Sequence, residues 1–287
     1  MSQLSWSPAE EAVPAAPPTR GEPRVAHRTQ EELDERNRSY GHAGVSQAQE
    51  ILRGRYRLAT AQEAFVLLRN ASQRHNIKLR TLADAVIRTP GPDRDAARWF
   101  PARARYSPPR LSGLSVDNGS RASQGAVLKA VLHQVLSVTQ TPMGNVQLAR
   151  GGQLHLVRHT GLNRYFTDFF AFVDAPTTAC SRAAAERRQV TVPDVAVADV
   201  FDEASRQAIL QAGSRAVHSL PLLDRSGRVL GMVSSHHERP VGGFSRARLT
   251  TLRQTGSDAG RWLDWHRRTV VLDALEHLHS TATATAA

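Results

Sequence analysis

Hydrophobic periodicity changes once along this sequence, and the change separates two kinds of domain. From about Glu31 to Ile87 the chain has no proline, and its apolar residues recur three and four positions apart, as on one face of a helix. Beyond about residue 140 apolar and polar residues alternate instead, which is typical of half-buried strands. The sequence therefore predicts a multi-domain protein, with an all-α N-terminal module and a C-terminal α+β domain.

Three apolar stripes lie in the first segment, and each predicts one helix with a single face to bury. They comprise Val45, Ala48, Ile51 and Leu52; Ala64, Phe65, Leu68, Ala71 and Ser72; and Leu79, Leu82, Ala83, Val86 and Ile87. Thr60 and Glu63 have the spacing of a capping box, and Asn76 precedes the third stripe as a candidate N-cap. We expect these helices to form a three-helix bundle over residues 29–90.

Segments of different composition flank the bundle. Residues 1–28 are rich in Pro, Ala and Glu, with too little apolar surface to offset the entropy of ordering, so we expect a disordered tail. Residues 91–123 combine several prolines with Arg and Ser, which predicts an interdomain linker. The α+β domain is then expected over residues 124–270, and residues 271–287 are expected to be a C-terminal tail.

Strands and helices of the second domain follow from its pattern. A hairpin is expected at 146–149 and 154–157, around Gly151 and Gly152, with further strands at 190–192, 216–223 and 229–235. Helices are expected at 126–140, 163–173, 177–188, 203–212 and 245–268. This order predicts an antiparallel sheet covered by helices.

Charge is distributed unevenly along the chain. The formal net charge is +11, and residues 41–110 hold thirteen Arg or Lys against five Asp or Glu. Such a surplus favours a polyanionic partner, because cations that neutralise phosphates release condensed counterions. Composition alone leaves the alternative open that the arginines serve solubility.

The cellular compartment is indicated by the lack of a membrane-spanning segment, of a signal peptide and of paired cysteines in the sequence. No apolar run approaches the roughly 20 residues needed to span a bilayer, and the first thirty residues do not have the pattern of a signal peptide. The single cysteine, Cys180, excludes an internal disulfide or a CxxC pair, and packing is its expected role. We expect a cytoplasmic protein without a membrane partner.

The first segment resembles the ANTAR family over about 45 residues. The resemblance rests on Val45–Leu52, Arg55–Tyr56, Glu63–Phe65, Leu68–Arg69, Ser72, Asn76, Lys78–Leu79 and Leu82–Ala83. One departure is Gln49-Glu50, where the family usually has Lys-Gly. The resemblance implies a homodimer that binds RNA stem-loops in leader transcripts and promotes transcription antitermination. Its candidate RNA-binding residues here are Arg55, Arg69, Arg74, Lys78 and Arg80, since guanidinium groups pair with phosphates and stack on exposed bases.

The second domain resembles GAF domains over about residues 125–268. The segments that carry this resemblance are 144–148, 178–180, 192–195, 212–213, 219–222 and 227–234. It implies a sensory domain with a small-molecule pocket between the sheet and its covering helices, near Phe166, Phe169, Phe170 and Cys180. The scaffold does not identify the ligand or any cofactor, because one such fold serves many functions.

Other functions are less well supported by the residues. His155, His159, His218, His236 and His237 fall on expected strands without the spacing of metal ligands, so we expect them to be exposed. No catalytic motif is present, and an enzyme is not expected. The helical module could instead bind proteins or the major groove of DNA. The proline-rich linker argues against coupling of the two domains through one rigid helix.

Overall fold

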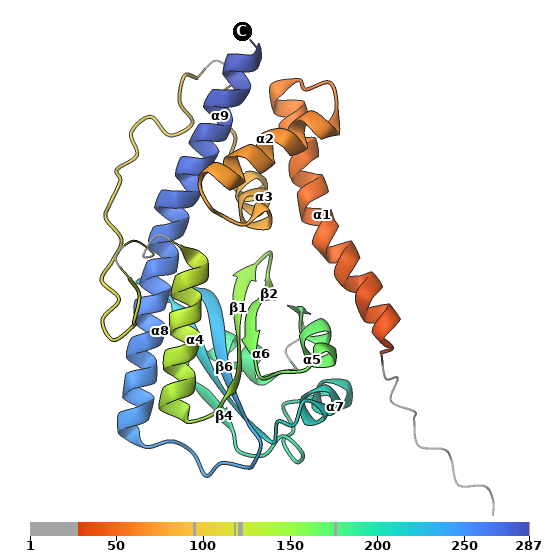
Figure 1. Ribbon diagram of the computed structural model, residues 1–287, viewed down its shortest axis with the longest axis vertical. Helices are drawn as coiled ribbons and strands as arrows, with labels where there is room; N and C mark the ends of the chain where they lie inside the picture. The colour runs from red at the N-terminus through yellow and green to blue at the C-terminus, as the bar shows by residue number, and fades with distance from the viewer. Residues whose placement is uncertain (1–27, 94–95, 118, 120–122, 175–176, 287) are drawn as a thin grey trace, which may run out of the picture.

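A computed structural model describes residues 28–93, 96–117, 119, 123–174 and 177–286 (Figure 1). The tail expected at residues 1–28 therefore lies, apart from Arg28, outside the described residues. Within them, a helical module is followed by an α+β domain with an antiparallel sheet, which confirms the expected fold class.

The helical module contains α1 (Gln30–Tyr56), α2 (Ala61–Arg74) and α3 (Leu79–Arg88). Thr29 and Glu32 form a capping box at the start of α1. Thr60 caps α2, and its hydroxyl accepts a hydrogen bond from the Glu63 N–H at 3.2 Å, as expected. The expected Asn76 cap is wrong, because Asn76 has φ of +48° in the turn and α3 begins after Lys78 without a side-chain cap.

The α+β domain begins with α4 (Gln124–Thr139) and contains six strands in the order β3-β2-β1-β6-β5-β4. The strands are β1 (Met143–Arg150), β2 (Gln153–Thr160), β3 (Phe172–Val173), β4 (Val190–Val192), β5 (Ala216–Leu223) and β6 (Val229–His237), and every neighbouring pair is antiparallel. The intervening helices are α5 (Arg164–Phe169), α6 (Ala179–Glu186) and α7 (Glu203–Gln211). The helix expected over 163–173 is thus shorter, because residues 172–173 leave it to pair with β2.

Helices cover both faces of this sheet. One face packs against α4 and α8 (Arg246–His266), around a core that includes Val146, Leu148 and Trp262. Gly256 and Gly260 on α8 permit the close approach to β5, because a Cβ at either position would collide with the β5 backbone. The other face packs against α5, α6 and α7.

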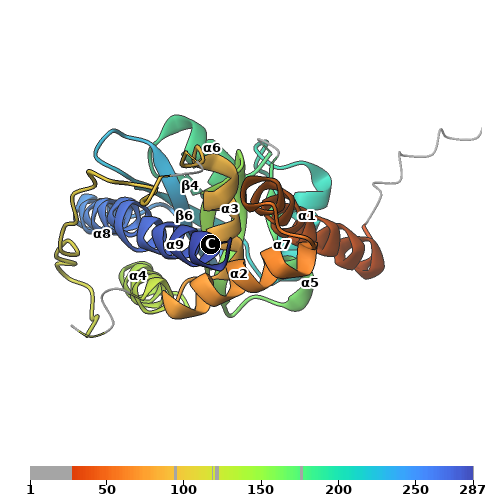
Figure 2. The same cartoon turned by 90° about the horizontal axis from the view of Figure 1, so that it is seen from above.

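The expected C-terminal tail is wrong, because the chain continues from α8 through a π-helical turn (Arg267–Val271) into α9 (Leu272–Ala286). Figure 1 shows α8 and α9 in blue, running along one side of the molecule, and Figure 2 shows α9 beside α2. Ala274, Leu275 and Leu278 of α9 are fully buried in one cluster with residues of α1, α2 and α3. The last helix of the chain therefore completes the core of the N-terminal module.

The connection between α3 and α4 is packed onto both domains. Trp99 is buried in the helical core, whereas Leu111 and Leu114 are buried against the sheet layer of α4 and α8. The Glu276 carboxylate on α9 accepts hydrogen bonds from the N–H groups of Trp99 and Phe100, at 3.2 and 2.9 Å. This segment joins the two domains and also fixes α9 in place.

Across the described ranges, no helix is both long and apolar enough to cross a membrane.

Candidate RNA-binding surface and ligand pocket

Four of the five basic residues expected to bind RNA are exposed on the helical module. Arg69 and Arg74 lie on α2, Lys78 precedes α3, and Arg80 lies in its first turn. Within the described part of the chain, none of these four side chains forms an ion pair. They will be called the basic surface.

Arg80 also fixes how α3 sits against α1. Its guanidinium lies where a Cβ at Gly41 would be, so the buried Gly41 leaves room for it. The cation of Arg80 is therefore placed at the junction of the two helices while remaining accessible to solvent.

Arg55, the fifth expected residue, is only partly exposed. Its guanidinium carbon lies 4.7 Å from the centre of the Trp99 ring, and its Nη1 is buried without a hydrogen-bond partner among the described residues. Trp99 comes from the connection to α4, and the periodicity of the helices carried no sign that it would dock there. We therefore assign Arg55 a packing role.

Two chambers lie beside α5 in the α+β domain. The inner chamber lies between the sheet and helices α5–α7, has a volume of about 30 Å³, and is lined by Phe166, Phe170 and Cys180 among others. A cavity of this size is large enough to hold a water molecule. Phe169 is absent from its walls and lines the outer chamber instead. The expected pocket residues are thus adjacent, but they divide between two cavities.

A row of buried polar side chains forms the sheet wall of the inner chamber: Asn145 and Gln147 from β1, Ser219 from β5, and Ser234 and His236 from β6. The hydroxyls of Ser219 and Ser234 lie 2.9 Å apart, and the Gln147 amide donates to the Phe170 carbonyl at 3.4 Å. The Gln147 Oε1 is buried without a partner among the described residues. Polar residues at alternate, inward-facing positions of β1 were the sequence signal for this row, which was not among the predicted site residues.

The expectation of exposed strand histidines is wrong for four of the five, because His155 is half-buried against Phe172 and three others are buried. His218, His236 and His237 are 0%, 3% and 8% exposed, because β5 and β6 are central strands covered on both faces. His236 Nε2 lies 3.1 Å from Asn145 Oδ1, and its Nδ1 lies 3.1 Å from the Ser214 hydroxyl. Burial lowers the pKa of His236 to about 3, so the ring is neutral at pH 7 and donates from Nε2.

Cys180 is buried at the start of α6. Its Sγ lies 3.1 Å from the Thr178 hydroxyl, and burial raises the pKa of the thiol. A thiol with a raised pKa is a poor nucleophile at neutral pH. The site geometry thus fits the packing role expected from the sequence.

The outer chamber opens beside the inner one, and the two share Phe170 and Thr178 as walls. Its volume is about 680 Å³, within the usual range of about 300–1,000 Å³ for small-molecule sites. Arg28 and residues of α1 form one side of it, and the rest comes from α5, β3, the segment before α6 and the start of α7.

Solved structures similar to the second domain include several GAF domains. A GAF domain/HD domain protein from Geobacter sulfurreducens is 20% identical, with 53% of this chain and 99% of that chain covered and a TM-score of 0.44. The GAF domain from an Acinetobacter phosphoenolpyruvate-protein phosphotransferase is 12% identical, with 51% and 87% covered and a TM-score of 0.40. A free methionine-R-sulfoxide reductase from Neisseria meningitidis is 16% identical, with 57% and 98% covered and a TM-score of 0.36.

The sequence comparisons concern the helical module. No curated protein matches the sequence. The family model for the ANTAR domain matches residues 27–87, which include α1, α2 and nearly all of α3. Behind this segment lies the α+β domain whose structural neighbours are GAF domains. The chain therefore carries an ANTAR domain at its N-terminal end.

Proposed function

We propose that this protein is a cytoplasmic, RNA-binding regulator of transcription antitermination whose α+β domain senses a small molecule. The observation that carries the RNA-binding part is the basic surface, which exposes four cations without ion pairs to described residues on an ANTAR domain. The targets we propose are stem-loops in leader transcripts. A homodimer, as the family resemblance implies, is part of the proposal.

The chemistry of the basic surface suits structured RNA. Arg69, Arg74 and Arg80 can form paired hydrogen bonds to phosphate and stack on unpaired bases, whereas Lys78 provides a point charge. A side chain that is engaged in a salt bridge must break it before it binds RNA, which costs free energy. None of these four side chains has a salt bridge to a described residue, so none has this cost. Stabilising one stem-loop over a competing terminator requires only that the bound RNA structure gain binding free energy.

The sensory part of the proposal is supported by the inner chamber. Buried polar side chains at the centre of a sheet lower the stability of the fold relative to apolar side chains when one of their acceptors has no partner. The Oε1 of Gln147 is such an acceptor, since it has no partner among the described residues. A ligand that supplies a donor to Gln147 Oε1 would remove this cost. Ligand binding would then shift the population of any state in which the chamber is wider.

Sequencing of RNAs crosslinked to the full-length protein in its native host tests this function. Enrichment of leader stem-loops, followed by gel-shift binding of those RNAs with purified protein, is the expected result. Preference for duplex DNA of the same sequence would favour the DNA-binding alternative. Absence of any enriched nucleic acid would favour a protein-interaction module and contradict the proposal.

A further inference from the structure

The first turns of α1 leave the helical module and dock on the α+β domain. Leu33 is fully buried there, in one cluster with Phe166, Phe169 and Phe170 of the α5 region. Tyr40 packs against Phe172 with ring centres 5.2 Å apart. One helix therefore belongs to the ANTAR domain at one end and to the sensory domain at the other.

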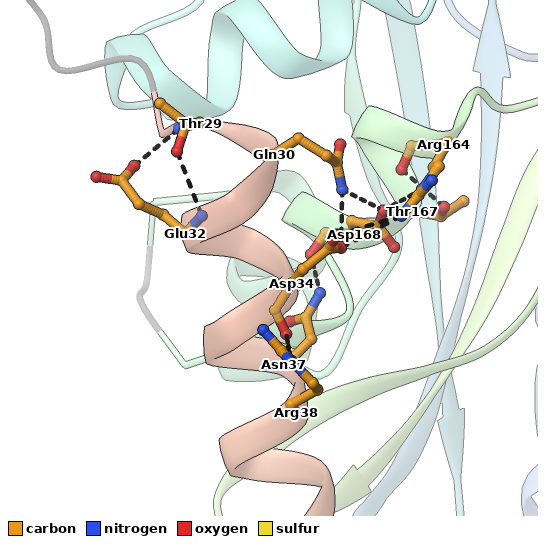
Figure 3. A network of polar contacts seen from close by, with 9 residues as sticks. All are labelled: Thr29, Gln30, Glu32, Asp34, Asn37, Arg38, Arg164, Thr167 and Asp168. Carbon is orange, nitrogen blue, oxygen red and sulfur yellow. Dashed lines mark hydrogen bonds and ion pairs between the residues drawn. The ribbon is translucent and has the colours of Figure 1, made fainter.

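Polar contacts fix this docking at Asp168, near the end of α5 (Figure 3). Its carboxylate accepts a hydrogen bond from the Gln30 amide at 2.6 Å, and its carbonyl accepts one from the Asn37 amide at 2.8 Å. Arg164, on the same helix, forms ion pairs with Asp168 and with Asp34 of α1. Any movement of α5 must therefore move α1 or break these bonds.

Two arginines of this docked segment face the outer chamber. Arg36 Nη2 donates to the carbonyls of Asp168 and Phe169, at 3.0 and 2.7 Å, but its Nε is buried without a partner in the described part of the chain. The guanidinium of Arg28 lies 5.7 Å from the centre of the Phe169 ring. Neither arginine forms an ion pair with a described residue, although both line the same cavity.

The acidic residues of the chamber, in contrast, already have hydrogen-bond donors. Asp202 accepts from the Ser205 N–H at 2.7 Å and the Thr177 hydroxyl at 2.6 Å, and Glu32 accepts from the Thr29 N–H at 2.7 Å. Asp174 accepts from the Gln153 amide at 3.4 Å. Arg36 and Arg28 are thus the cationic groups of the chamber without an ion pair to a described residue, although the carboxylates of Asp174 and Asp202 lie close enough to interact with them electrostatically.

The apolar part of the wall comes mainly from Phe169, Phe170, Phe172 and Val173. A ligand that fits both the two guanidiniums and the apolar part of the wall combines an anionic group with an apolar body. We propose that the outer chamber binds an organic carboxylate, whose charge pairs with Arg36 and Arg28 while its apolar part lies on these phenylalanines. The proposal rests on the sensory part of the proposed function and is independent of RNA binding.

Regulation follows from where these residues lie. The anion would touch α1 directly, so binding would tighten the contact between the ANTAR helix and the sensory domain rather than act only through the sheet. Phe170 and Thr178 line both chambers, so a ligand or a movement of side chains in the inner chamber would also affect the contact with α1. The ligand state would in this way set how firmly the first turns of α1 are held.

Binding is tested with full-length protein and a panel of benzoate, 4-phenylbutyrate and octanoate, by thermal shift and calorimetry. The corresponding alcohols and amines are the matched probes without negative charge. We expect a carboxylate to stabilise the wild type and to protect the amides of residues 30–40 from hydrogen exchange. Arg36→Gln should weaken binding by about tenfold or more, since it removes a hydrogen bond to a charged group.

Arg28→Gln provides a second variant that keeps the docking bonds of α1, because only the backbone carbonyl of Arg28 bonds to Tyr165. Arg38→Gln, on α1 but outside the chamber, is the control with the same charge change. Weakened binding in Arg28→Gln but not in Arg38→Gln supports the site. Failure of every carboxylate to bind, equal binding of alcohols, or equal weakening in the control overturns it. Leader-RNA binding by the same protein is measured separately, so failure of either proposal leaves the other standing.

Discussion

The Tyr56 hydroxyl lies 3.0 Å from Nδ1 of His279, which ties the last turn of α1 to α9 across 223 positions of sequence. His279 Nε2 lies 2.7 Å from the Ala96 carbonyl and donates to it, so Nδ1 accepts the proton of Tyr56. Burial raises the pKa of Tyr56 to about 12, which keeps this donor protonated. The ANTAR domain is thus closed by the last helix of the chain.

Truncation of Leu275 should therefore destabilise the helical module. Leu275→Ala leaves a cavity between α9 and the ANTAR helices, and we expect the free energy of unfolding to fall by about 2–5 kcal/mol. Chemical denaturation followed by tryptophan fluorescence measures this change. Ser280→Ala, at an exposed position of α9, is the control. Equal stability of Leu275→Ala and wild type would mean that α9 does not complete this core.

The basic surface predicts a specific salt dependence. Arg69→Ala combined with Lys78→Ala should weaken binding to a tandem stem-loop RNA and lower the slope of log K against log salt by about one for each phosphate that is no longer neutralised. Gel-shift titrations over a range of salt concentrations measure both quantities. Lys129→Ala with Arg225→Ala removes the same charge from the α+β domain. If this control pair lowers the slope equally, the effect is one of net charge and not of the surface.

The burial of Leu33 predicts that this side chain stabilises the docked part of α1. Leu33→Ala removes a fully buried side chain from the cluster with Phe166 and should cost about 2–5 kcal/mol. Hydrogen exchange should rise first in residues 30–40, because docking and not helix propensity holds that segment. Glu35→Ala on the exposed side of α1 should leave exchange unchanged. A uniform rise over all of α1 in Leu33→Ala would contradict a separate docking contact.

Buried histidines predict a decrease of stability on acidification. Burial lowers the pKa of His218 and His266 to about 4 and that of His236 to about 3, below the usual value of about 6.5 in the unfolded chain. The unfolded state therefore binds more protons in this window, so the free energy of unfolding should fall as pH decreases from about 6.5 toward 4. Denaturation curves at pH 7 and pH 4.5 test this. His236→Gln should reduce the difference between them, with exposed His159→Gln as the comparison.

Cys180 should be protected from thiol reagents in the folded protein. The thiol is buried and its pKa is raised, so little thiolate forms and little reagent reaches it. Labelling with a disulfide reagent at pH 7.5 should proceed only at the rate of unfolding and become fast in denaturant. Rapid labelling of native protein, with its circular dichroism spectrum unchanged, would show that the inner chamber opens to solvent.

Local patterns in the sequence were sufficient for most of the elements, though not for β3 or α9. The Thr60 N-cap and the strand at residues 216–223 were predicted because spacing and capping are properties of neighbouring residues. The ANTAR resemblance likewise depended on residues that lie within one short segment, and the family match confirms it.

Contacts between distant segments were decided only by the tertiary structure. The apolar residues at 274–278 form too short a stripe to predict a core helix, and they become core residues only because α9 packs against α1, α2 and α3. Arg55 has the sequence pattern of an exposed cation, but in the structure its guanidinium packs on Trp99. Likewise, Leu33 stands among charged residues, and only its docking on α5 reveals a core position. Periodicity shows that a residue has a face to bury, but the partner is set by which surfaces the folded chain brings together.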